Sequence, residues 1–407
     1  MVVAEEPTTK IPGSIKTLVA AAFIIALGFG FISPILPQYI TSFNVGTAAA
    51  GFVISVFAIS RLIFAPFAGR LVDALGSRTI YISGLLSVAV TTTLVGVAQE
   101  YWHIVALRGL AGFGSTMFTV SAMGLVVKLS PPEIRGRCSG AYASGFLFGS
   151  ILGPLAGSAL SFLGMRWPFV IYGVFLSLAS LIVYLRLPKN IGEATPTSES
   201  KPAFSPKEAV RLNTYRAALI ASFANGWANF GVRIAIVPLF AATVFHQGPA
   251  FAGVILAAYA VGNALALQFS GRLADRHGRK PLIIVGLFVS ATFTATFGLT
   301  EDIYHLIALS VLAGVGSGLY NPPMQASLAD LIGNDRAGGK VLASYQMSSD
   351  FGAILGPILI GAVVEIYGYE IGFLATSAVL FFAAIRWVFA RETLAIKATV
   401  ENLEPRE

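Results

Sequence analysis

Charged residues are scarce in this sequence, at 12% of the chain, whereas hydrophobic residues make up 56%. A soluble globular protein carries about twice that charged fraction. The sequence therefore lacks the residues needed for an ordinary water-facing surface, which indicates that most of the chain lies in lipid.

Residues that support catalysis or metal binding are also few. The single cysteine, Cys138, excludes an intramolecular disulfide and a cysteine metal cluster, and we expect it at the start of the fifth helix. No cluster of His, Cys and carboxylates has metal-ligand spacing. The sequence also has no Walker loop and no nucleophile elbow. It therefore predicts no enzyme, no cofactor, no bound metal and no ATP-driven pump.

Long apolar runs, in contrast, are abundant. A helix needs about 20 apolar residues to cross the hydrocarbon core. Continuous rather than alternating hydrophobicity favours helices over a β-barrel. The sequence predicts an all-α integral membrane protein with twelve transmembrane helices. The runs lie near residues 16–40, 49–71, 78–99, 102–127, 140–162, 167–187, 215–243, 251–271, 282–300, 303–329, 341–364 and 371–390.

The placement of charge predicts the orientation. Glu5, Glu6 and Lys10 precede the first run, so the start of the chain does not resemble a signal peptide. An even number of helices puts both termini on one side. If that side is cytoplasmic, the short outer loops hold one basic residue, Arg166, as the positive-inside rule requires. The net charge of +7 therefore indicates membrane topology rather than nucleic-acid binding. We expect a multi-pass monomer in a bacterial inner membrane with both termini cytoplasmic.

The sequence repeats itself at a spacing of about 202 residues. This predicts two pseudo-symmetric six-helix bundles of parallel topology, with a substrate path between them and a rocking, alternating-access motion. The predicted parts are an N-terminal bundle (1–187), a cytoplasmic linker (188–214) and a C-terminal bundle with a short tail (215–407). In the linker, Ser205-Pro206-Lys207-Glu208 has the form of a capping box and predicts a short helix to about Asn213. The matching segments include Phe29-Gly30 with Phe230-Gly231, Gly51 with Gly253, Leu110-Ala111-Gly112 with Leu312-Ala313-Gly314, and Gly153-Pro154 with Gly356-Pro357.

Two inner loops, after the second and eighth helices, combine glycines with a carboxylate and several cations. We expect each to form a tight turn at a helix end, with charges that pair differently in different conformations. In the fifth helix, glycines spaced by four share one face and permit close packing or a moving interface, and Pro154 and Pro357 can bend their helices. The residues of these conformational motifs are Gly69, Asp73, Gly76, Arg78, Gly271, Asp275, Gly278, Arg279, Gly149, Gly153, Pro154, Gly356 and Pro357.

With these motifs the chain resembles the major facilitator superfamily, and within it the twelve-helix drug:proton antiporters. The loop that begins at Gly271 matches the superfamily signature, whereas the loop at Gly69 departs from it at Ala74 and Ser77. Arg108-Gly109 in the fourth helix is similar to the family motif there, and the resemblance associates Arg108 with proton coupling. The fifth-helix glycines resemble the antiporter motif.

Charged residues inside the predicted helices mark functional positions, because each costs roughly 2.5 to 3.5 kcal/mol at the bilayer centre. Asp350 is the only carboxylate near the middle of a helix. It lies at about the same depth as Arg61, roughly 14 to 15 Å from the inner face. We expect the two to pair across the bundles, either as a permanent ion pair or as a bridge that protonation of Asp350 releases.

Polar residues of the seventh and tenth helices are the candidates for substrate binding. Arg233 either bonds backbone carbonyls around Pro238 or holds an anionic substrate group. The first, fourth, seventh and tenth helices have no carboxylate at mid-membrane depth, so a neutral, zwitterionic or anionic amphipathic substrate is favoured over a cation. The candidates are Arg233, Asn225, Trp227, Asn229, Tyr320, Asn321 and Gln325.

The sequence thus favours a proton-coupled exporter of small amphipathic compounds or drugs, with a role in antibiotic resistance. Its expected partners are a small molecule, protons and membrane lipid. Two alternatives stay open: a transporter of one metabolite such as a sugar or organic acid, and a membrane receptor without transport. Receptors of that kind usually carry a large soluble domain, which the short polar segments do not provide.

Overall fold

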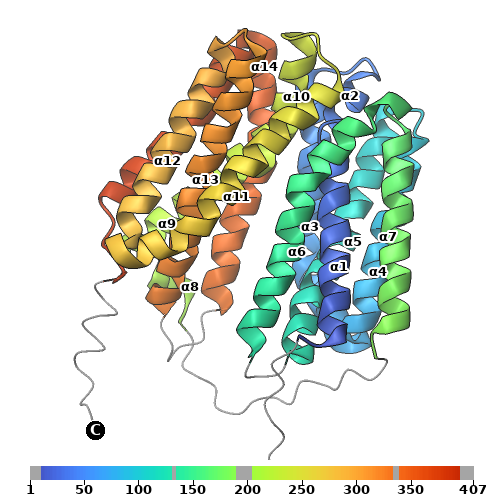
Figure 1. Ribbon diagram of the computed structural model, residues 1–407, viewed down its shortest axis with the longest axis horizontal. Coiled ribbons are helices and arrows are strands. Elements are labelled where there is room, and N and C mark those ends of the chain that lie inside the picture. Colours follow the sequence, from blue (N-terminus) through green and yellow to red (C-terminus); the bar gives the residue numbers. More distant parts are fainter. Residues whose placement is uncertain (1–10, 131–133, 189–203, 333–338, 395–407) are drawn as a thin grey trace, which may run out of the picture. The chain divides into compact units, whose positions relative to one another are not determined.

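Helices form all the regular structure that the computed structural model describes, in residues 11–130, 134–188, 204–332 and 339–394. The predicted all-α class is therefore confirmed (Figure 1). In chain order the elements are α1 (Gly13–Ile32), α2 (Leu36–Thr41), α3 (Thr47–Leu75), α4 (Ser77–Gly96), α5 (Tyr101–Leu129), α6 (Arg135–Ala159), the 3-10 helix η2 (Ser161–Leu163), α7 (Trp167–Arg186), α8 (Pro206–Ala209), α9 (Asn213–Asn225), the π-helix η3 (Gly226–Val232), α10 (Arg233–Thr243), α11 (Pro249–His277), α12 (Arg279–Ala295), the 3-10 helix η4 (Thr296–Leu299), α13 (Ile303–Ile332) and α14 (Gly339–Val388).

Within the described residues, 10 helical segments are long and apolar enough to cross a membrane. One of them is most of α14, which has 50 residues and a non-helical residue, Gly368 with φ 83°, that divides it into two helices. The glycine-rich α6 has 25 residues, the length of a span, and lies outside those 10. These helices are compatible with twelve membrane crossings, and that number stays a prediction.

Contacts divide the chain into two units. Unit 1 consists of Met1–Tyr39 and Val56–Thr197, and unit 2 of Ile40–Ser55 and Ser198–Glu407. In unit 1, α1 packs on α6 and α7, while α4 packs on α5 and α7. In unit 2, α13 packs on α11 and α12, and α14 contacts α9, η3 and α12. Each unit is thus a bundle with its own helix contacts.

The two units repeat the same close backbone contacts at corresponding positions. A Cβ at Gly149 would collide with the Phe23 carbonyl oxygen, and a Cβ at Gly352 with that of Phe223. Glycine at these positions lets two helix backbones approach closely, so the duplication seen in the sequence is also present in the packing. Further matched contacts are Gly112 on Phe57 with Gly314 on Tyr259, and Gly84 on Gly114 with Gly286 on Gly316.

The segment Ile40–Ser55 belongs to unit 2 although it lies early in the chain. Ser55 Oγ donates to the Ile354 carbonyl oxygen at 2.6 Å, and Ala48 N donates to Glu365 Oε1 at 2.9 Å. These bonds hold the first turns of α3 against α14.

The loops that follow α3 and α11 are shorter than the sequence predicted, because both helices extend into the motif residues. Gly69 and Gly271 lie within α3 and α11, and nothing lies within 4 Å of a Cβ added at either. The turns are made instead by Gly76 and Gly278, whose φ values of 83° and 95° favour glycine. Each predicted loop thus contains a tight glycine turn at a helix end, but the loop is shorter than expected because α3 and α11 continue past their apolar runs into polar sequence.

The capping box in the predicted linker is confirmed. Glu208 N donates to Ser205 Oγ at 3.3 Å, and Ser205 N donates to Glu208 Oε2 at 3.2 Å. The helix α8 ends at Ala209, earlier than expected, and α9 begins at Asn213. Residues 189–203 of the linker lie outside the described residues.

Candidate substrate site and conformational motifs

The seventh predicted span contains a π-helix, η3, between α9 and α10. Two of its glycines lie against α14: a Cβ at Gly226 would collide with the Ser349 carbonyl oxygen, and one at Gly231 would lie 2.8 Å from Pro357 Cδ. Helical segments of this kind are frequent at functional sites because they redirect side chains. Nothing in the sequence signalled the π-helix, which changes the faces on which the polar residues of this span lie.

A polar cluster joins the start of η3 to α13 in unit 2. Asn229 Nδ2 donates to Asn225 Oδ1 at 2.9 Å and lies 2.8 Å from Tyr320 Oη. Tyr320 Oη donates to Asn225 Oδ1 at 2.7 Å. Tyr320 is fully buried, whereas the two asparagines are half-buried. The cluster brings together three of the predicted substrate residues and offers both donors and acceptors in an apolar setting.

Asn321 extends this cluster through Ser317. Its Nδ2 donates to the Ser317 carbonyl oxygen at 3.0 Å and to Ser317 Oγ at 3.1 Å, and Asn229 Nδ2 lies 3.3 Å from the same hydroxyl. Trp227 is buried where η3 contacts α14, and Gln325 is exposed on α13. Neither takes part in this hydrogen-bond network. Ser317 was not among the predicted site residues, although its position one turn before Asn321 on the same helix was a signal that could have suggested it.

Arg233 is buried in unit 2, with 5% of its surface exposed. Its guanidinium carbon lies 3.7 Å from the centroid of the Tyr259 ring and 5.6 Å from that of Phe297. Such cation–π contacts stabilise a desolvated charge by about 2 kcal/mol. The Nε and Nη1 groups of Arg233 have no hydrogen-bond partner among the described residues. Two donors of Arg233 are therefore without a described partner, and the rings of Tyr259 and Phe297 contact its charged group.

A small void lies beside Arg233 and is lined also by Thr294 and Thr376. Its volume of about 10 Å³ is close to the space that one water molecule needs. Thr294 Oγ1 has no partner among the described residues, whereas Thr376 Oγ1 donates to the Gly372 carbonyl oxygen. The surroundings of Arg233 thus contain room and polar groups for a water or a single small ligand atom.

Unit 1 holds a second buried arginine of the same kind. Arg108 is 6% exposed, and its guanidinium carbon lies 4.3 Å from the centroid of the Phe57 ring. Phe57 and Tyr259 occupy corresponding positions of the repeat, as the matched contacts of Gly112 and Gly314 show. The arginines come from different helices, α5 in unit 1 and the start of α10 in unit 2. The aromatic partner of each arginine was missed in the sequence.

Arg61 and Asp350 lie in different units, so their pairing stays a prediction. Both side chains are half-buried. Thr116 Oγ1 donates to the Arg61 carbonyl oxygen at 3.2 Å, which joins α3 to α5. Asp350 Oδ1 accepts a hydrogen bond from Gln346 Nε2 at 3.3 Å, one turn earlier on α14.

The inner loop of unit 2 is organised around Arg279. Its Nε lies 2.6 Å from Asp330 Oδ2, and its Nη1 lies 3.5 Å from Asp275 Oδ1. The side chains of Arg279 and Asp330 are 10% and 12% exposed, whereas that of Asp275 is 66% exposed. The buried ion pair thus ties the start of α12 to the end of α13, and Asp330 is a partner that the sequence did not predict.

The corresponding loop of unit 1 uses a different contact. Arg78 Nη2 donates to the Tyr184 carbonyl oxygen at 2.6 Å, and its guanidinium carbon lies 5.2 Å from the centroid of the Tyr184 ring. The side chain of Asp73 lies outside the described part of the structure. Arg78 therefore anchors α4 to α7.

The predicted glycine and proline motifs lie at close helix contacts within each unit. A Cβ at Gly153 would lie 2.5 Å from the Leu27 carbonyl oxygen, and one at Gly356 would lie 2.8 Å from that of Trp227. A Cβ at Gly30 would lie 2.7 Å from Pro154 Cδ. Pro154 and Pro357 thus occupy equivalent packing positions, on α6 and α14.

Glu392, just after α14, caps the start of α12. Its carboxylate accepts hydrogen bonds from Arg279 N and Lys280 N at 3.0 and 2.9 Å, and from Thr393 N and Leu394 N at 2.9 and 3.1 Å. Burial raises the pKa of this carboxyl, but the four backbone donors outweigh burial and leave the pKa below its ordinary value of 4.5. This cap could not be predicted from the sequence, because Glu392 is distant in the chain from α12.

Glu392→Ala is expected to lower the free energy of unfolding by about 1 kcal/mol, as for the loss of other helix caps. The native pKa is below the ordinary value, so the carboxylate stabilises the fold above that value. This contribution is lost as the pH falls through the lowered pKa. Thermal unfolding of the purified protein should thus differ between wild type and variant at pH 7, with the difference shrinking below about pH 4.5. Glu301→Ala, at an exposed site, is the control, and an equal change in both variants would contradict the capping role.

The chain matches a family profile over nearly its whole length. The profile of the Major Facilitator Superfamily matches residues 18–233 and again residues 218–404. The chain belongs to the Major Facilitator Superfamily. It is therefore a membrane transporter of small molecules by family, and the predicted membership is confirmed.

Curated relatives and solved structures agree with this assignment. The chain is 27% identical over 383 residues to Multidrug resistance protein MdtG of Salmonella typhi and of Salmonella choleraesuis, covering 89% of this chain and 91% of each relative. Among solved structures it is similar to a bacterial homolog to the human lysosomal transporter Spinster in the inward-facing, unoccupied conformation, with a TM-score of 0.75, 18% identity and coverage of 98% and 100% of the two chains. It is also similar to the nucleoside transporter NupG, with a TM-score of 0.71, 16% identity and coverage of 96% and 100%. These structures share the fold.

Proposed function

We propose that this transporter exports small amphipathic compounds, including drugs, in exchange for protons by alternating access. The observation that carries the proposal is the composition of the unit 2 site. Asn225 and Asn229 lie one to two helical turns before the buried cation Arg233 in the same span, and both are hydrogen-bonded to Tyr320 of α13. Such a site suits ligands with a large apolar surface and a few polar groups.

The charge of the site favours neutral, zwitterionic or anionic substrates. Arg233 is a buried cation with two N–H groups that have no described partner. The helices α9, η3 and α10 contain no carboxylate, and the only carboxylate of α13 is Asp330, near its end and paired with Arg279. A lipophilic cation would meet an uncompensated positive charge, whereas an anionic group would neutralise it.

Export and proton coupling draw on two further observations. The curated relatives are named multidrug resistance proteins, and Asp350 is a protonatable group within α14. We place the protein in a bacterial inner membrane as a monomer with both termini cytoplasmic, in keeping with the positive-inside distribution of its Lys and Arg residues. Arg61 and Arg108 are the proposed partners of Asp350 in coupling, and the predicted bundles at 1–187 and 215–407 are the proposed moving parts.

Transport by the purified protein in proteoliposomes tests the function. With an imposed pH gradient and a panel of anionic, neutral and cationic amphipathic compounds, we expect accumulation driven by the gradient that an ionophore abolishes. Flux of a single hydrophilic metabolite, with no amphipathic compound carried, would instead establish a metabolite transporter. Absence of flux with retained ligand binding would establish a receptor.

Arg233→Gln is expected to weaken binding of an anionic compound about tenfold or more, the loss typical of one charge-assisted hydrogen bond of about 1.5 to 3 kcal/mol. Binding of a neutral compound should change by less than about threefold. Substrate dissociation constants measured by tryptophan fluorescence quenching or scintillation proximity give the comparison. Arg272→Gln, an exposed cation of α11, serves as the matched control. Equal weakening of anionic and neutral ligands by Arg233→Gln would assign Arg233 a structural role only.

A further inference from the structure

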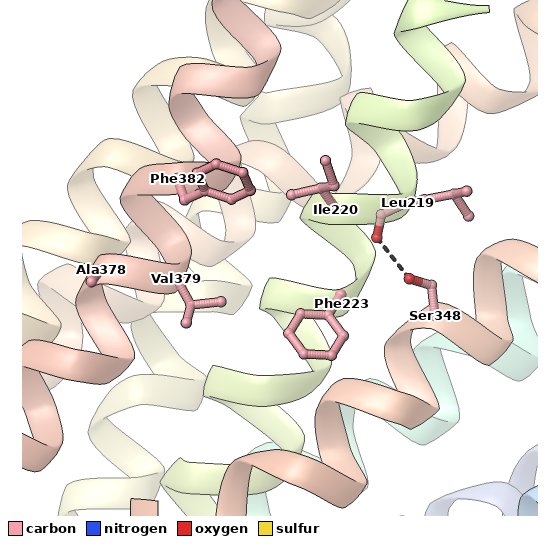
Figure 2. Close-up of a pocket in the computed structure, with 7 residues that line it drawn as sticks. All are labelled: Leu219, Ile220, Phe223, Ser348, Ala378, Val379 and Phe382. Atoms are coloured by element: carbon pink, nitrogen blue, oxygen red, sulfur yellow. Dashed lines mark hydrogen bonds between the residues drawn. The ribbon is translucent and has the colours of Figure 1, made fainter. Parts of the chain in front are cut away.

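An apolar groove in unit 2 lies apart from the polar cluster described above. It is formed by α9 and by the two helices into which Gly368 divides α14, and its volume of about 570 Å³ falls in the range of small-molecule sites. Figure 2 shows the residues that line it on these three helices. They are Leu219, Ile220, Phe223, Ser348, Ala378, Val379 and Phe382.

The lining leaves no polar group for a ligand to bind. The one hydroxyl, Ser348 Oγ, already donates to the Leu219 carbonyl oxygen at 2.8 Å, as the dashed line in Figure 2 marks. The other lining side chains are hydrocarbon, and Phe382 is 55% exposed on a membrane-spanning helix. The groove therefore suits an alkyl chain that enters from the surrounding bilayer.

One end of the groove is marked by two cations. Arg216 lies one turn before Ile220 on α9 and is exposed, and Arg386 lies one turn after Phe382 on α14. Because residues four apart share a helix face, both arginines continue the groove lining toward the same end. Arg386 Nη2 reaches across to Asn213 Oδ1 at 3.4 Å, which shows that the two helices meet there. The ion pairs found among the described residues involve neither arginine.

Unit 1 differs from unit 2 at the corresponding positions. Gly145 corresponds to Ser348, and a Cβ added there would lie 2.8 Å from the Val19 carbonyl oxygen, so the helix backbones approach more closely. In unit 2 the serine side chain stands between the two helices. Counted from the positive-φ glycines Gly164 and Gly368, Ile182 takes the place of Arg386. The serine between the helices and the second of the two cations are thus not repeated at the corresponding positions of unit 1.

From these observations we infer that the unit 2 groove binds one acyl chain of an anionic phospholipid, whose headgroup phosphate contacts Arg216 and Arg386. Basic residues at the membrane surface attract anionic headgroups, and an apolar groove beside them retains the chain. The lipid comes from the leaflet on the side of these arginines, which is the cytoplasmic leaflet in the proposed orientation. The inference does not depend on the transported substrate.

Native mass spectrometry of the full-length, delipidated protein tests the site, with phosphatidylglycerol and phosphatidylethanolamine of identical chains as probes. We expect phosphatidylglycerol to bind preferentially, and the double variant R216Q/R386Q to weaken its binding by about tenfold or more. The matched control is Lys16→Gln, at the position of unit 1 that corresponds to Arg216, and it should leave binding unchanged. Equal binding of both lipids to the wild type, or unchanged binding to R216Q/R386Q, would overturn the proposal.

A second variant separates the groove from the cations. Ala378→Trp fills the groove and leaves both arginines in place, so it should reduce phosphatidylglycerol binding. Glycerophosphoglycerol, which has no acyl chains, should compete poorly with phosphatidylglycerol for binding to the wild-type protein. Thermal unfolding in the absence of lipid checks that each variant is folded. Full phosphatidylglycerol binding by a folded Ala378→Trp variant would show that only the headgroup is recognised, and would overturn the assignment of the groove.

Discussion

Asp350→Asn is expected to abolish the accumulation of substrate that a proton gradient drives. Asparagine keeps the shape of the side chain and can still bond Gln346, but it cannot carry a proton through the cycle. A proton that moves down a driving force of about 100 mV supplies roughly 2.3 kcal/mol. That free energy sustains a concentration ratio of about 50 for a substrate exchanged with one proton. The steady-state ratio in proteoliposomes should therefore fall from about 50 toward 1.

Substrate exchange without a gradient distinguishes coupling from folding. The Asp350→Asn variant should still exchange labelled for unlabelled substrate, because binding and the conformational change do not require net proton movement. Asp302→Asn, at an exposed position beside His305, is the control and should accumulate substrate normally. A gradient of wild-type size in Asp350→Asn would remove Asp350 from the coupling mechanism.

Asp330→Asn is expected to destabilise the protein by about 3 to 5 kcal/mol, the usual cost of removing one partner of a buried ion pair. Asp330 and Arg279 are both nearly buried and lie 2.6 Å apart, so the variant leaves an uncompensated cation between α12 and α13. The remaining carboxylate near Arg279, that of Asp275, is exposed and compensates little. Thermal unfolding of the purified protein measures the loss.

The double variant R279Q/D330N tests whether the lost stability comes from the unpaired charge. It removes both charges and should be more stable than Asp330→Asn alone, although it has one more substitution. Asp275→Asn affects the same arginine at an exposed position and should cost less than about 1 kcal/mol. If the double variant instead loses the sum of the unfolding free energies that Arg279→Gln and Asp330→Asn each cost alone, the two side chains do not interact energetically.

The helical class and the repeat could be predicted from the sequence because both depend on the residue types within short stretches of the chain. A lipid-spanning run requires hydrophobic residues throughout, and glycines such as Gly149 and Gly352 are required wherever two backbones touch. The capping box at Ser205 and Glu208 was predictable for the same reason, since both of its hydrogen bonds join residues three apart. The short range of these interactions makes them visible in the sequence.

The contacts of the candidate site were less predictable because they join residues far apart in the chain. Asn225 and Tyr320 were both named as substrate candidates, but their direct hydrogen bond depends on how η3 turns toward α13. For Arg233 the sequence left open backbone carbonyls around Pro238 or an anionic substrate group, and the contact with the Tyr259 ring was not predicted. Depth along a helix follows from counting residues, whereas the neighbour of a side chain depends on the rotation and packing of two helices.

The two buried arginines share one feature of the repeat and differ in another. Their aromatic partners, Phe57 and Tyr259, stand at one position of the repeat, whereas the arginines reach them from different helices. The position of the ring is therefore common to both units, whereas the helix that supplies the cation is not. An aromatic face at this position can contact a buried charge that arrives from either side, so the two units differ in the placement of charge while they keep the same helix packing.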